Sequence, residues 1–245
     1  MRLAGARVLI TGASSGVGAA TARVMAEAGA RLVLAGRDKA RLEAVAAETG
    51  GCVVVSDVMD GVDELAERAG AVDVLVNNAG VGWAGPLAGM PQQRADELVA
   101  VNMAAPIQLT RLLLPGMVAK GEGHIVFVAS IAGAIGVGNE AVYSATKAGL
   151  LVFAEALHHE LRGSRRVGVS TVLPGVVDTP FFDRRGAGYE RRWPRPIPPE
   201  RVARAIVTAI RRGRAESYVP AWLRLPARLR GAAPGPFRRL ARPLG

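Results

Sequence analysis

A tyrosine and a lysine four residues apart, Tyr143 and Lys147, form the pair in this sequence best suited to acid–base chemistry. The stretch Val142–Leu161 has a helical period, so both side chains would share one helix face, with the ammonium below the phenol. A phenol stays protonated until about pH 10, and a nearby cation favours its ionised form. The pair could therefore move a proton near neutral pH. The spacing alone leaves open an ordinary amphipathic surface pair.

Ser130 could assist such a proton transfer. It ends the β-branched run His124–Ala129 and precedes Tyr143 by 13 residues. A hydroxyl there can donate a hydrogen bond to a substrate oxygen on which negative charge develops.

A glycine-rich turn follows the first β-branched run, Arg7–Ile10, and leads directly into a helical stretch. Glycines permit a tight turn, and a helix N-terminus offers free N–H groups and a positive dipole end to a pyrophosphate. A glycine-rich turn alone is a weak signal, but its position between strand and helix strengthens it. The turn has the pattern TGxxxGxG rather than the common GxGxxG, with the residues Thr11, Gly12, Ala13, Ser14, Ser15, Gly16, Val17 and Gly18.

This spacing resembles that of the short-chain dehydrogenase/reductase family, from Arg7 to about Val219, and further motifs occur in the family's order. Their ordered co-occurrence is far more specific than any one of them. The motifs are NNAG (Asn77, Asn78, Ala79, Gly80), then Asn102, then Ser130 with the YxxxK pair Tyr143 and Lys147, then PGxxxT (Pro174, Gly175, Thr179).

The resemblance implies an α/β fold, a three-layer doubly wound Rossmann domain with a seven-stranded parallel sheet. It implies that the cofactor delivers hydride to a carbonyl carbon while Tyr143 protonates the oxygen, that Ser130 assists, and that Asn102 holds a water that relays protons by way of Lys147. The cofactor-binding residues that it implies, together with Arg37, are Gly12, Ser14, Ser15, Gly16, Val17, Gly18, Asp57, Val58, Asn78, Ala79, Gly80, Tyr143, Lys147, Pro174, Gly175, Val177 and Thr179.

The residues after the second β-branched run favour NADP over NAD. In NAD-binding Rossmann domains an acidic residue about 20 residues beyond the glycine-rich turn binds the ribose hydroxyls. The corresponding position here is Gly36, and Arg37 follows, whose guanidinium can bind a 2′-phosphate. The alternative is that Arg37 is a solvated loop residue, with Asp38 beside it weakening the charge.

The substrate pocket would be closed by a loop at about residues 176–199, which mixes Gly, Pro, Arg and aromatic residues without a clear period. Its apolar side chains indicate an apolar ketone or aldehyde, or the matching alcohol, as substrate. Those side chains are Val176, Val177, Phe181, Phe182 and Trp193, which Trp83 could join.

Rival functions remain. A noncatalytic nucleotide-sensing module would have lost the chemistry, which the intact Ser130, Tyr143 and Lys147 oppose. An NAD-preferring alcohol dehydrogenase is the second alternative, and it would require that Arg37 binds no 2′-phosphate. A sugar epimerase or dehydratase of the extended branch of the same superfamily usually has a larger C-terminal substrate domain and a different spacing of glycines in the turn. Neither feature is seen in this sequence. A nucleic-acid binder would need a recognition motif in the basic tail, and none is found.

The elements that must position these residues alternate in the βα order that predicts a parallel sheet covered on both faces. The expected strands are Arg7–Ile10, Arg31–Ala35, Cys52–Ser56, Val72–Val76, His124–Ala129, Val167–Leu173 and Ser217–Val219. The expected helices are Val17–Ala28, Lys39–Glu48, Val62–Ala69, Gln92–Val118, Val142–Leu161 and Pro199–Arg212.

The net charge of +10 is confined to one end of the chain. Residues 184–245 hold 16 arginines against three acids, and the body is slightly acidic. We expect a Rossmann domain over residues 1–220 and a basic Pro- and Arg-rich tail over 221–245. Three roles stay open for the tail: contact with an anionic membrane, a cover for the pocket or a neighbouring subunit, or disorder.

The remaining expectations concern the environment of the chain. No membrane span and no secretory signal are expected, which favours the cytoplasm, with peripheral membrane association as the alternative. The resemblance implies a homodimer or homotetramer, and we expect no nucleic acid and no metal. Cys52, the one cysteine, should be a small buried hydrophobe, and His158 and His159 should face solvent or an interface.

Overall fold

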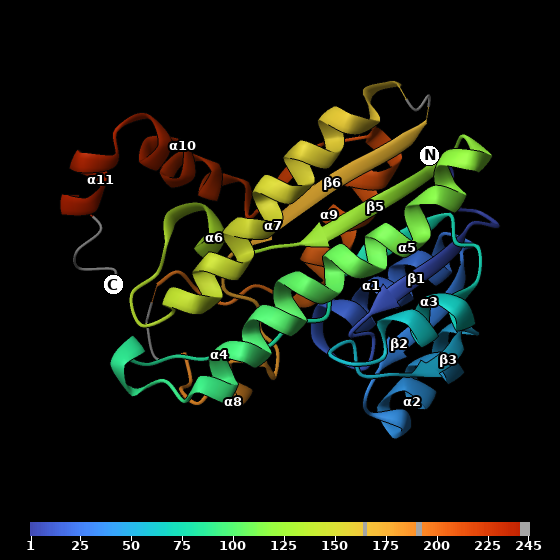
Figure 1. Cartoon of the computed structure of the whole chain (residues 1–245), viewed down its shortest axis with the longest axis horizontal. Helices are drawn as coiled ribbons and strands as arrows, with labels where there is room; N and C mark the ends of the chain where they lie inside the picture. The colour runs from blue at the N-terminus through green and yellow to red at the C-terminus, as the bar shows by residue number, and fades with distance from the viewer. Residues whose placement is uncertain (164–165, 190–192, 241–245) are drawn as a thin grey trace.

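The computed structural model describes residues 1–163, 166–189 and 193–240. Seven parallel strands form one sheet in the order β3-β2-β1-β4-β5-β6-β7, and helices cover both of its faces (Figure 1). The predicted fold class is therefore confirmed. The strands are β1 (Arg7–Thr11), β2 (Arg31–Gly36), β3 (Cys52–Val55), β4 (Val74–Asn77), β5 (Gly123–Val128), β6 (Val167–Pro174) and β7 (Glu216–Val219).

The helices follow the strands in the right-handed βαβ manner expected of a parallel sheet. The main ones are α1 (Gly16–Glu27), α2 (Lys39–Thr49), α3 (Val62–Ala69), α4 (Gln92–Val99), α5 (Ala105–Lys120), α7 (Ala141–Glu160) and α9 (Pro199–Arg212). Shorter helices are α6 (Ile131–Ile135), α8 (Phe181–Arg184), α10 (Arg224–Ala232) and α11 (Pro234–Leu240). Single turns are η1 (Leu87–Gly89), η3 (Leu161–Gly163), η4 (Ala221–Leu223) and the π-helical η2 (Ala100–Ala104).

Two apolar layers hold the sheet between its helices. One layer packs α1, α2 and α9 on one face, with Met25, Leu42 and Ile206 fully buried. The other packs α3, α5 and α7 on the opposite face, with Leu65, Leu109 and Leu150 buried. Because both faces are covered, the central strands are mostly buried and largely apolar, as is typical of parallel sheets.

Local sequence signals explain where several helices begin and end. Asp38 caps α2 by accepting a hydrogen bond from the Arg41 backbone N–H at 3.0 Å, and Gly50 ends the helix in a left-handed conformation. Helix α9 begins at Pro199 and is followed by Gly213 in a left-handed conformation, as expected from these residue types.

The predicted helix Gln92–Val118 is one continuous run of α4, η2 and α5. Among the described residues, this run of 29 residues is the one helix long and apolar enough to cross a membrane, by length and composition alone. Its inner side packs on the sheet through Val101, Leu109 and Met117, as a core helix does, so this criterion carries little weight.

Two expectations are corrected by the structure. Cys52 is exposed rather than buried, because β3 is an edge strand and its first residue lies outside the helix layers. The loop after Pro174 is not free of regular structure, since it contains α8 and a parallel bridge between Val177 and Ile197. Residues 190–192 of this loop lie outside the described part of the chain.

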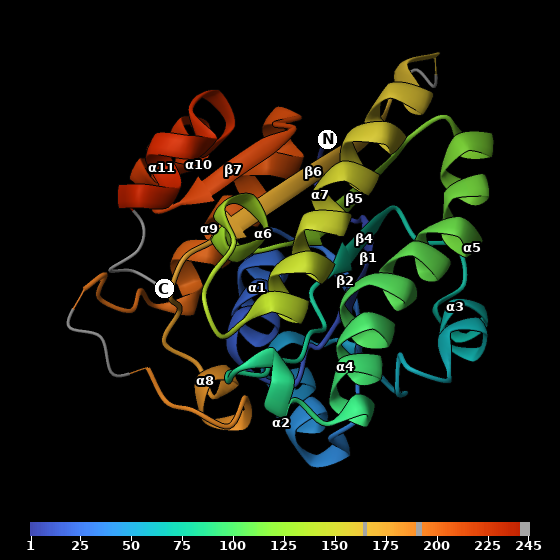
Figure 2. The ribbon, with the colours of Figure 1, turned by 60° about the vertical axis from the view of Figure 1, so that its left-hand side comes forward.

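The tail described up to residue 240 is helical. Helix α10 ends before Ala233 and α11 begins at Pro234, so the tail forms two short helices. Figures 1 and 2 show α10 beside α6 and α11 next to α10, at the end of the molecule where the carboxyl ends of the strands lie.

Candidate active site

A cavity of about 1050 Å³ opens at the carboxyl ends of the strands. In an open parallel sheet this is the edge at which ligands bind, next to the point where the strand order reverses. Here the order reverses between β1 and β4, and the glycine-rich turn after β1 lies at the floor of the cavity.

The turn after β1 leaves space that a side chain would fill. Gly12 has φ +65°, and a Cβ on it would lie 2.9 Å from the Cα of Ala79. A Cβ on Gly18 would lie 2.1 Å from the Gly12 carbonyl oxygen, so this third glycine lets α1 pack on its own turn. Gly18 therefore shapes the cradle without lining the cavity.

The N-terminus of α1 has free donors for an anion. Its N-cap, Ser15, makes no side-chain capping hydrogen bond, and the first turn holds no acid. The first N–H groups of a helix lack intrahelical partners and carry the positive end of its dipole. These observations fit a dinucleotide pyrophosphate.

Asn78 and Thr11 tie the β4 turn to the cradle. The Asn78 side-chain amide donates to the Thr11 carbonyl at 2.9 Å, and the Thr11 hydroxyl accepts from the backbone N–H groups of Asn78 and Ala79, each at 3.0 Å. The NNAG segment is thus held against the turn, with Asn78, Ala79 and Gly80 lining the cavity. Asn77 is buried behind them and donates to the Thr110 hydroxyl at 3.3 Å.

Two exposed arginines flank the outer end of the cavity after β2. Arg37 lies 3.6 Å from a carboxylate oxygen of Asp57, and Arg41 lies 3.2 Å from one of Asp38. Arg41 was not predicted as a site residue. Its signal was the spacing of four residues from Arg37 into the first turn of α2, which brings both guanidinium groups to one rim.

Ser130, Tyr143 and Lys147 are buried together at the inner end of the cavity. Ser130 is the N-cap of α6, and its hydroxyl accepts from the Ala132 N–H at 3.1 Å. The Lys147 ammonium donates to the Val128 carbonyl at 3.0 Å and lies 5.9 Å from the centre of the Tyr143 ring. The helical spacing of four residues thus puts the ammonium and the phenol on one side of α7, as predicted.

Burial controls the ionisation of this group. It raises the pKa of Tyr143 above its ordinary value, although the hydrogen bond with Ser130 opposes the rise. Burial also lowers the pKa of Lys147 to about 8. In the polypeptide without a bound cofactor, burial therefore outweighs the hydrogen bond with Ser130, and the pKa of Tyr143 is raised.

Asn102 is fully buried in the π-helical turn η2 and does not line the cavity. Its side-chain oxygen accepts from the Val81 N–H, and its amide donates to the Val81 carbonyl, both at 2.9 Å. The amide also lies 3.3 Å from the Thr146 hydroxyl. Asn102 therefore joins the segment after β4 to α7, next to Lys147.

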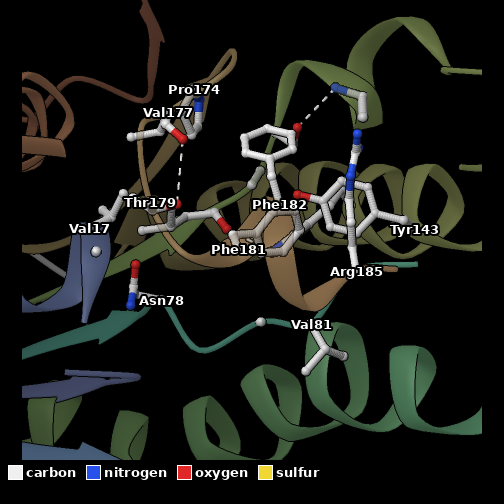
Figure 3. Close-up of a pocket in the computed structure, with 18 of the residues that line it drawn as sticks. Val17, Asn78, Val81, Tyr143, Pro174, Val177, Thr179, Phe181, Phe182 and Arg185 are labelled. Atoms are coloured by element: carbon white, nitrogen blue, oxygen red, sulfur yellow. Dashed lines mark hydrogen bonds between the residues drawn. The ribbon is translucent and has the colours of Figure 1, made fainter. Parts of the chain in front are cut away.

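Aromatic side chains of the loop after β6 form the opposite wall. The Phe181 ring lies 5.6 Å from the Tyr143 ring, and the rings of Phe181 and Phe182 are also 5.6 Å apart (Figure 3). Val176, Val177 and Trp193 line the same cavity, as predicted, whereas Trp83 does not. In this structure the Trp83 ring packs over Gly85 instead.

A buried ion pair fixes this wall to the start of α7. Arg185 pairs with Glu140, and their side chains are only 10% and 15% exposed. The Arg185 guanidinium also stacks over the Phe182 ring, 4.6 Å from its centre (Figure 3). Sequence reasoning missed this pair, because two oppositely charged residues 45 positions apart carry no local signal.

The tail supplies the outer wall of the cavity, through Leu223 and Phe237, which are buried, and Trp222, Leu225 and Pro226. The cavity thus brings together all predicted site residues except Gly18 and Asn102. Those that line it are Gly12, Ser14, Ser15, Gly16, Val17, Arg37, Asp57, Val58, Asn78, Ala79, Gly80, Ser130, Tyr143, Lys147, Pro174, Gly175, Val177 and Thr179. No group of three potential metal ligands is found in the described part of the chain.

These features define a Rossmann-type dinucleotide-binding protein, and comparison with known proteins narrows the class. The family model described as short chain dehydrogenase matches residues 6–190. The chain is 36% identical over 235 residues to "Ketoacyl reductase HetN" of Nostoc sp., a match that covers 89% of this chain and 79% of the relative. The protein belongs to the short-chain dehydrogenase/reductase family and is an oxidoreductase.

Solved structures agree. A short-chain dehydrogenase from Sphingobium yanoikuyae in complex with NADPH is 30% identical, with TM-score 0.82, covering 94% of this chain and 95% of that one. A short chain dehydrogenase/reductase from Burkholderia phymatum in complex with NAD is also 30% identical, with TM-score 0.84 and 95% coverage of both chains. A nicotinamide cofactor is therefore supported for this fold and site.

Proposed function

We propose that this enzyme uses NADP to interconvert an apolar ketone or aldehyde and its alcohol, with Tyr143 as the acid and base. One observation carries the proposal: Ser130, Tyr143 and Lys147 meet in the same cavity as an uncapped helix N-terminus and a pair of arginines. A noncatalytic sensor of nucleotides would not need the first three residues.

The cofactor would lie along the carboxyl edge of the sheet, with its pyrophosphate at Gly12 and the N-terminus of α1 and its nicotinamide beside Pro174 and Thr179. When bound, it supplies the hydride for the carbonyl carbon.

The residues of the chain would handle the proton. Tyr143 is protonated at neutral pH, as a phenol with an ordinary pKa would be, and burial raises its pKa further. It can therefore protonate a substrate oxygen. Ser130 would donate a second hydrogen bond to that oxygen. Lys147 would hold its charge near the phenol and favour the phenolate that remains after transfer.

After the transfer, Tyr143 would regain a proton from solvent by a route past Lys147 and the segment around Asn102. A Cβ on Gly80 would lie 3.2 Å from the Asn102 side-chain oxygen and 3.5 Å from the Lys147 ammonium. A glycine at this point keeps open the space between the two groups, where a water could relay protons.

Arg37 and Arg41 support NADP as the cofactor. Both are exposed at the rim of the cavity, and guanidinium groups bind phosphate through charge-assisted, often bidentate hydrogen bonds. No acid occupies position 36, where a carboxylate would repel a 2′-phosphate.

The substrate class follows from the walls of the pocket. Phe181 lies beside Tyr143, and Phe182, Trp222 and Phe237 add apolar surface to the same cavity. An apolar carbonyl compound fits such a wall, because it loses no hydrogen bonds to water on entry except those of its reacting oxygen.

The experiment that tests the proposal is a screen of apolar ketones and aldehydes, with oxidation of NADPH and of NADH measured side by side. Turnover with NADPH at a higher kcat/KM than with NADH is expected. Tight binding of NADPH with no turnover of any carbonyl compound or alcohol would instead favour the sensing module.

The first prediction concerns Tyr143→Phe. It should lower kcat by about 10³-fold, because the proton donor is lost, and leave the NADPH dissociation constant within about twofold, since the ring remains. Tyr218→Phe is the matched control, since Tyr218 lies on β7 and does not line the cavity. Retained turnover in Tyr143→Phe would remove Tyr143 from the mechanism.

We also propose that the enzyme is a homodimer or homotetramer. Val99, Val118 and Val152, on α4, α5 and α7, are exposed apolar residues that a second copy would cover. Light scattering coupled to size exclusion measures this, and a monomeric mass at micromolar concentration would contradict it.

A further inference from the structure

The outer side of α10 carries an apolar stripe with cations beside it. Leu225 and Leu229 are four residues apart, so they share one face of the helix, and they are 74% and 42% exposed. Trp222, at 44% exposure, continues this stripe one turn earlier. Arg224 and Arg228 form a parallel row next to it on the helix surface.

Among the described residues, the cations of this surface have no carboxylate partner. Helices α10 and α11 hold five exposed arginines, and no acid follows Glu216 in the sequence. In the part of the chain that the structure describes, none of the five pairs with a carboxylate. They are Arg224, Arg228, Arg230, Arg238 and Arg239.

The inner side of the same two helices forms the mouth of the cavity. Phe237 of α11 and Leu223, in the turn η4 that leads into α10, are buried there, and Pro226 of α10 lines the cavity with them. The Trp222 ring stacks on Trp193 of the loop after β6, with ring centres 5.0 Å apart, and both indoles line the cavity. The apolar stripe and the entrance to the pocket are therefore continuous.

We propose that α10 and α11 dock on an anionic lipid surface and turn the mouth of the pocket toward the bilayer. If the proposed carbonyl chemistry holds, on which this second statement rests, the substrate is an apolar ketone or alcohol dissolved in the membrane. It enters between Trp193, Trp222 and Leu225 without passing through water.

Charge and apolarity together select the lipid as occupant. An interfacial helix places its apolar stripe among the acyl chains while flanking arginines meet anionic headgroups, and tryptophan favours this boundary. A second copy docked through the same face would bring the unpaired arginines of both copies together, since a two-fold interface joins each patch to itself.

Co-sedimentation with vesicles tests the surface. Wild-type protein should bind vesicles of mixed phosphatidylglycerol and phosphatidylcholine at low salt, bind them less at high salt, and not bind pure phosphatidylcholine. The variant Arg228→Gln/Arg230→Gln/Arg239→Gln should bind about 100-fold more weakly, at about tenfold or less for each charge. Leu229→Glu should also lose binding, and neither variant alters a residue that lines the pocket.

A matched control removes three charges elsewhere. Arg204→Gln/Arg211→Gln/Arg212→Gln changes exposed arginines of α9 and should bind vesicles as the wild type does. If this control lost as much vesicle binding as the α10–α11 variant, net charge alone would explain the binding, and the docking surface would be overturned. No binding of the wild type to anionic vesicles, or masking of the face in a dimer or by an acidic protein, overturns it as well.

A kinetic comparison tests delivery of the substrate. A long-chain methyl ketone presented in anionic vesicles should be reduced with a kcat/KM about tenfold or more lower by the α10–α11 charge variant than by the wild type. A short, water-soluble methyl ketone should be reduced equally by both. If the variant loses kcat/KM equally for both ketones, or keeps the wild-type kcat/KM for both, delivery of the substrate from the bilayer is overturned. Vesicle binding without any NADPH oxidation would support the lipid-docking surface and contradict the proposed function.

Discussion

Gly36 occupies the position at which an acid would select NAD. A Cβ built there would lie 3.6 Å from both the Leu42 methyl carbon and the Ser14 hydroxyl, which is ordinary contact, so the site has room for a side chain. Its selectivity is therefore open to change without disturbing the fold.

The variant Gly36→Asp/Arg37→Ser should reverse the cofactor preference, because it adds an acceptor for the ribose hydroxyls and removes a phosphate partner. We expect the kcat/KM ratio of NADPH to NADH to fall by about 100-fold, at about 1.4 kcal/mol for each change. Lys39→Gln, which removes an exposed cation paired with Glu43, is the control. A wild type that already prefers NADH would show that Arg37 does not read the phosphate.

Arg185 is the second residue whose environment gives a sharp expectation. Arg185→Met would leave Glu140 charged in a nearly dry pocket and would release the aromatic wall from α7. We expect KM for the carbonyl substrate to rise by about tenfold, about 1.4 kcal/mol, while the NADPH dissociation constant changes little. Arg204→Met, on α9, is the control, since Arg204 is exposed, makes no ion pair in the described structure and does not line the cavity. A change in NADPH affinity alone would contradict the wall assignment.

Reactive residues with a local spacing were predictable, and those defined by contacts across the fold were not. Tyr143 and Lys147 share a helix, and Ser130 ends a strand, so pattern and family resemblance locate all three. Arg185 and the Asn102 contacts depend on segments that meet only after folding. The raised pKa of Tyr143 likewise depends on burial, which the spacing of two residues cannot supply.

At the scale of elements, β5 contains a buried histidine that takes no part in the proposed site, and its hydrogen-bond partner lies on β6. His124 lies 2.8 Å from the Ser170 hydroxyl, which in turn donates to the Arg214 carbonyl at 2.6 Å. Because that hydroxyl has only one proton, which it gives to the carbonyl, the histidine must donate to it through Nε2. Burial lowers the pKa of His124 from 6.5 to about 4.

This histidine should make stability depend on acid pH. Between pH 6.5 and about 4 the unfolded chain binds a proton at His124 that the folded chain does not. The free energy of unfolding should therefore fall by about 3 kcal/mol as the pH decreases through this window. Urea titrations of wild type and His124→Asn measure it, and the variant should lose that part of the slope. An identical slope in the variant would show that other groups cause it.

The seven strands and six long helices were predictable because apolar period and turn residues are local. The short helices α6, α8, α10 and α11 were not, since they form where tertiary packing covers four to nine residues. The edge position of β3, which exposes Cys52, follows from strand order and carries no signal in the residue itself.

At the scale of the whole molecule, the charge asymmetry of the sequence becomes a spatial one. The described part of the basic segment forms the loop after β6, helix α9, β7 and the two tail helices. The sequence showed that the arginines of the tail alternate with apolar residues. It could not show that the inner apolar residues line the pocket, because this depends on α10 lying against α6.

The stacked indoles of Trp193 and Trp222 provide an intrinsic spectroscopic signal for the contact between the loop after β6 and the C-terminal helices. The rings are inclined by 26°, and the chain has only three tryptophans. Two indole transitions at this separation couple, so the near-ultraviolet circular dichroism spectrum should contain an exciton contribution that Trp222→Phe abolishes. Its amplitude would record, without any label, whether the loop after β6 and the C-terminal helices are in contact in solution.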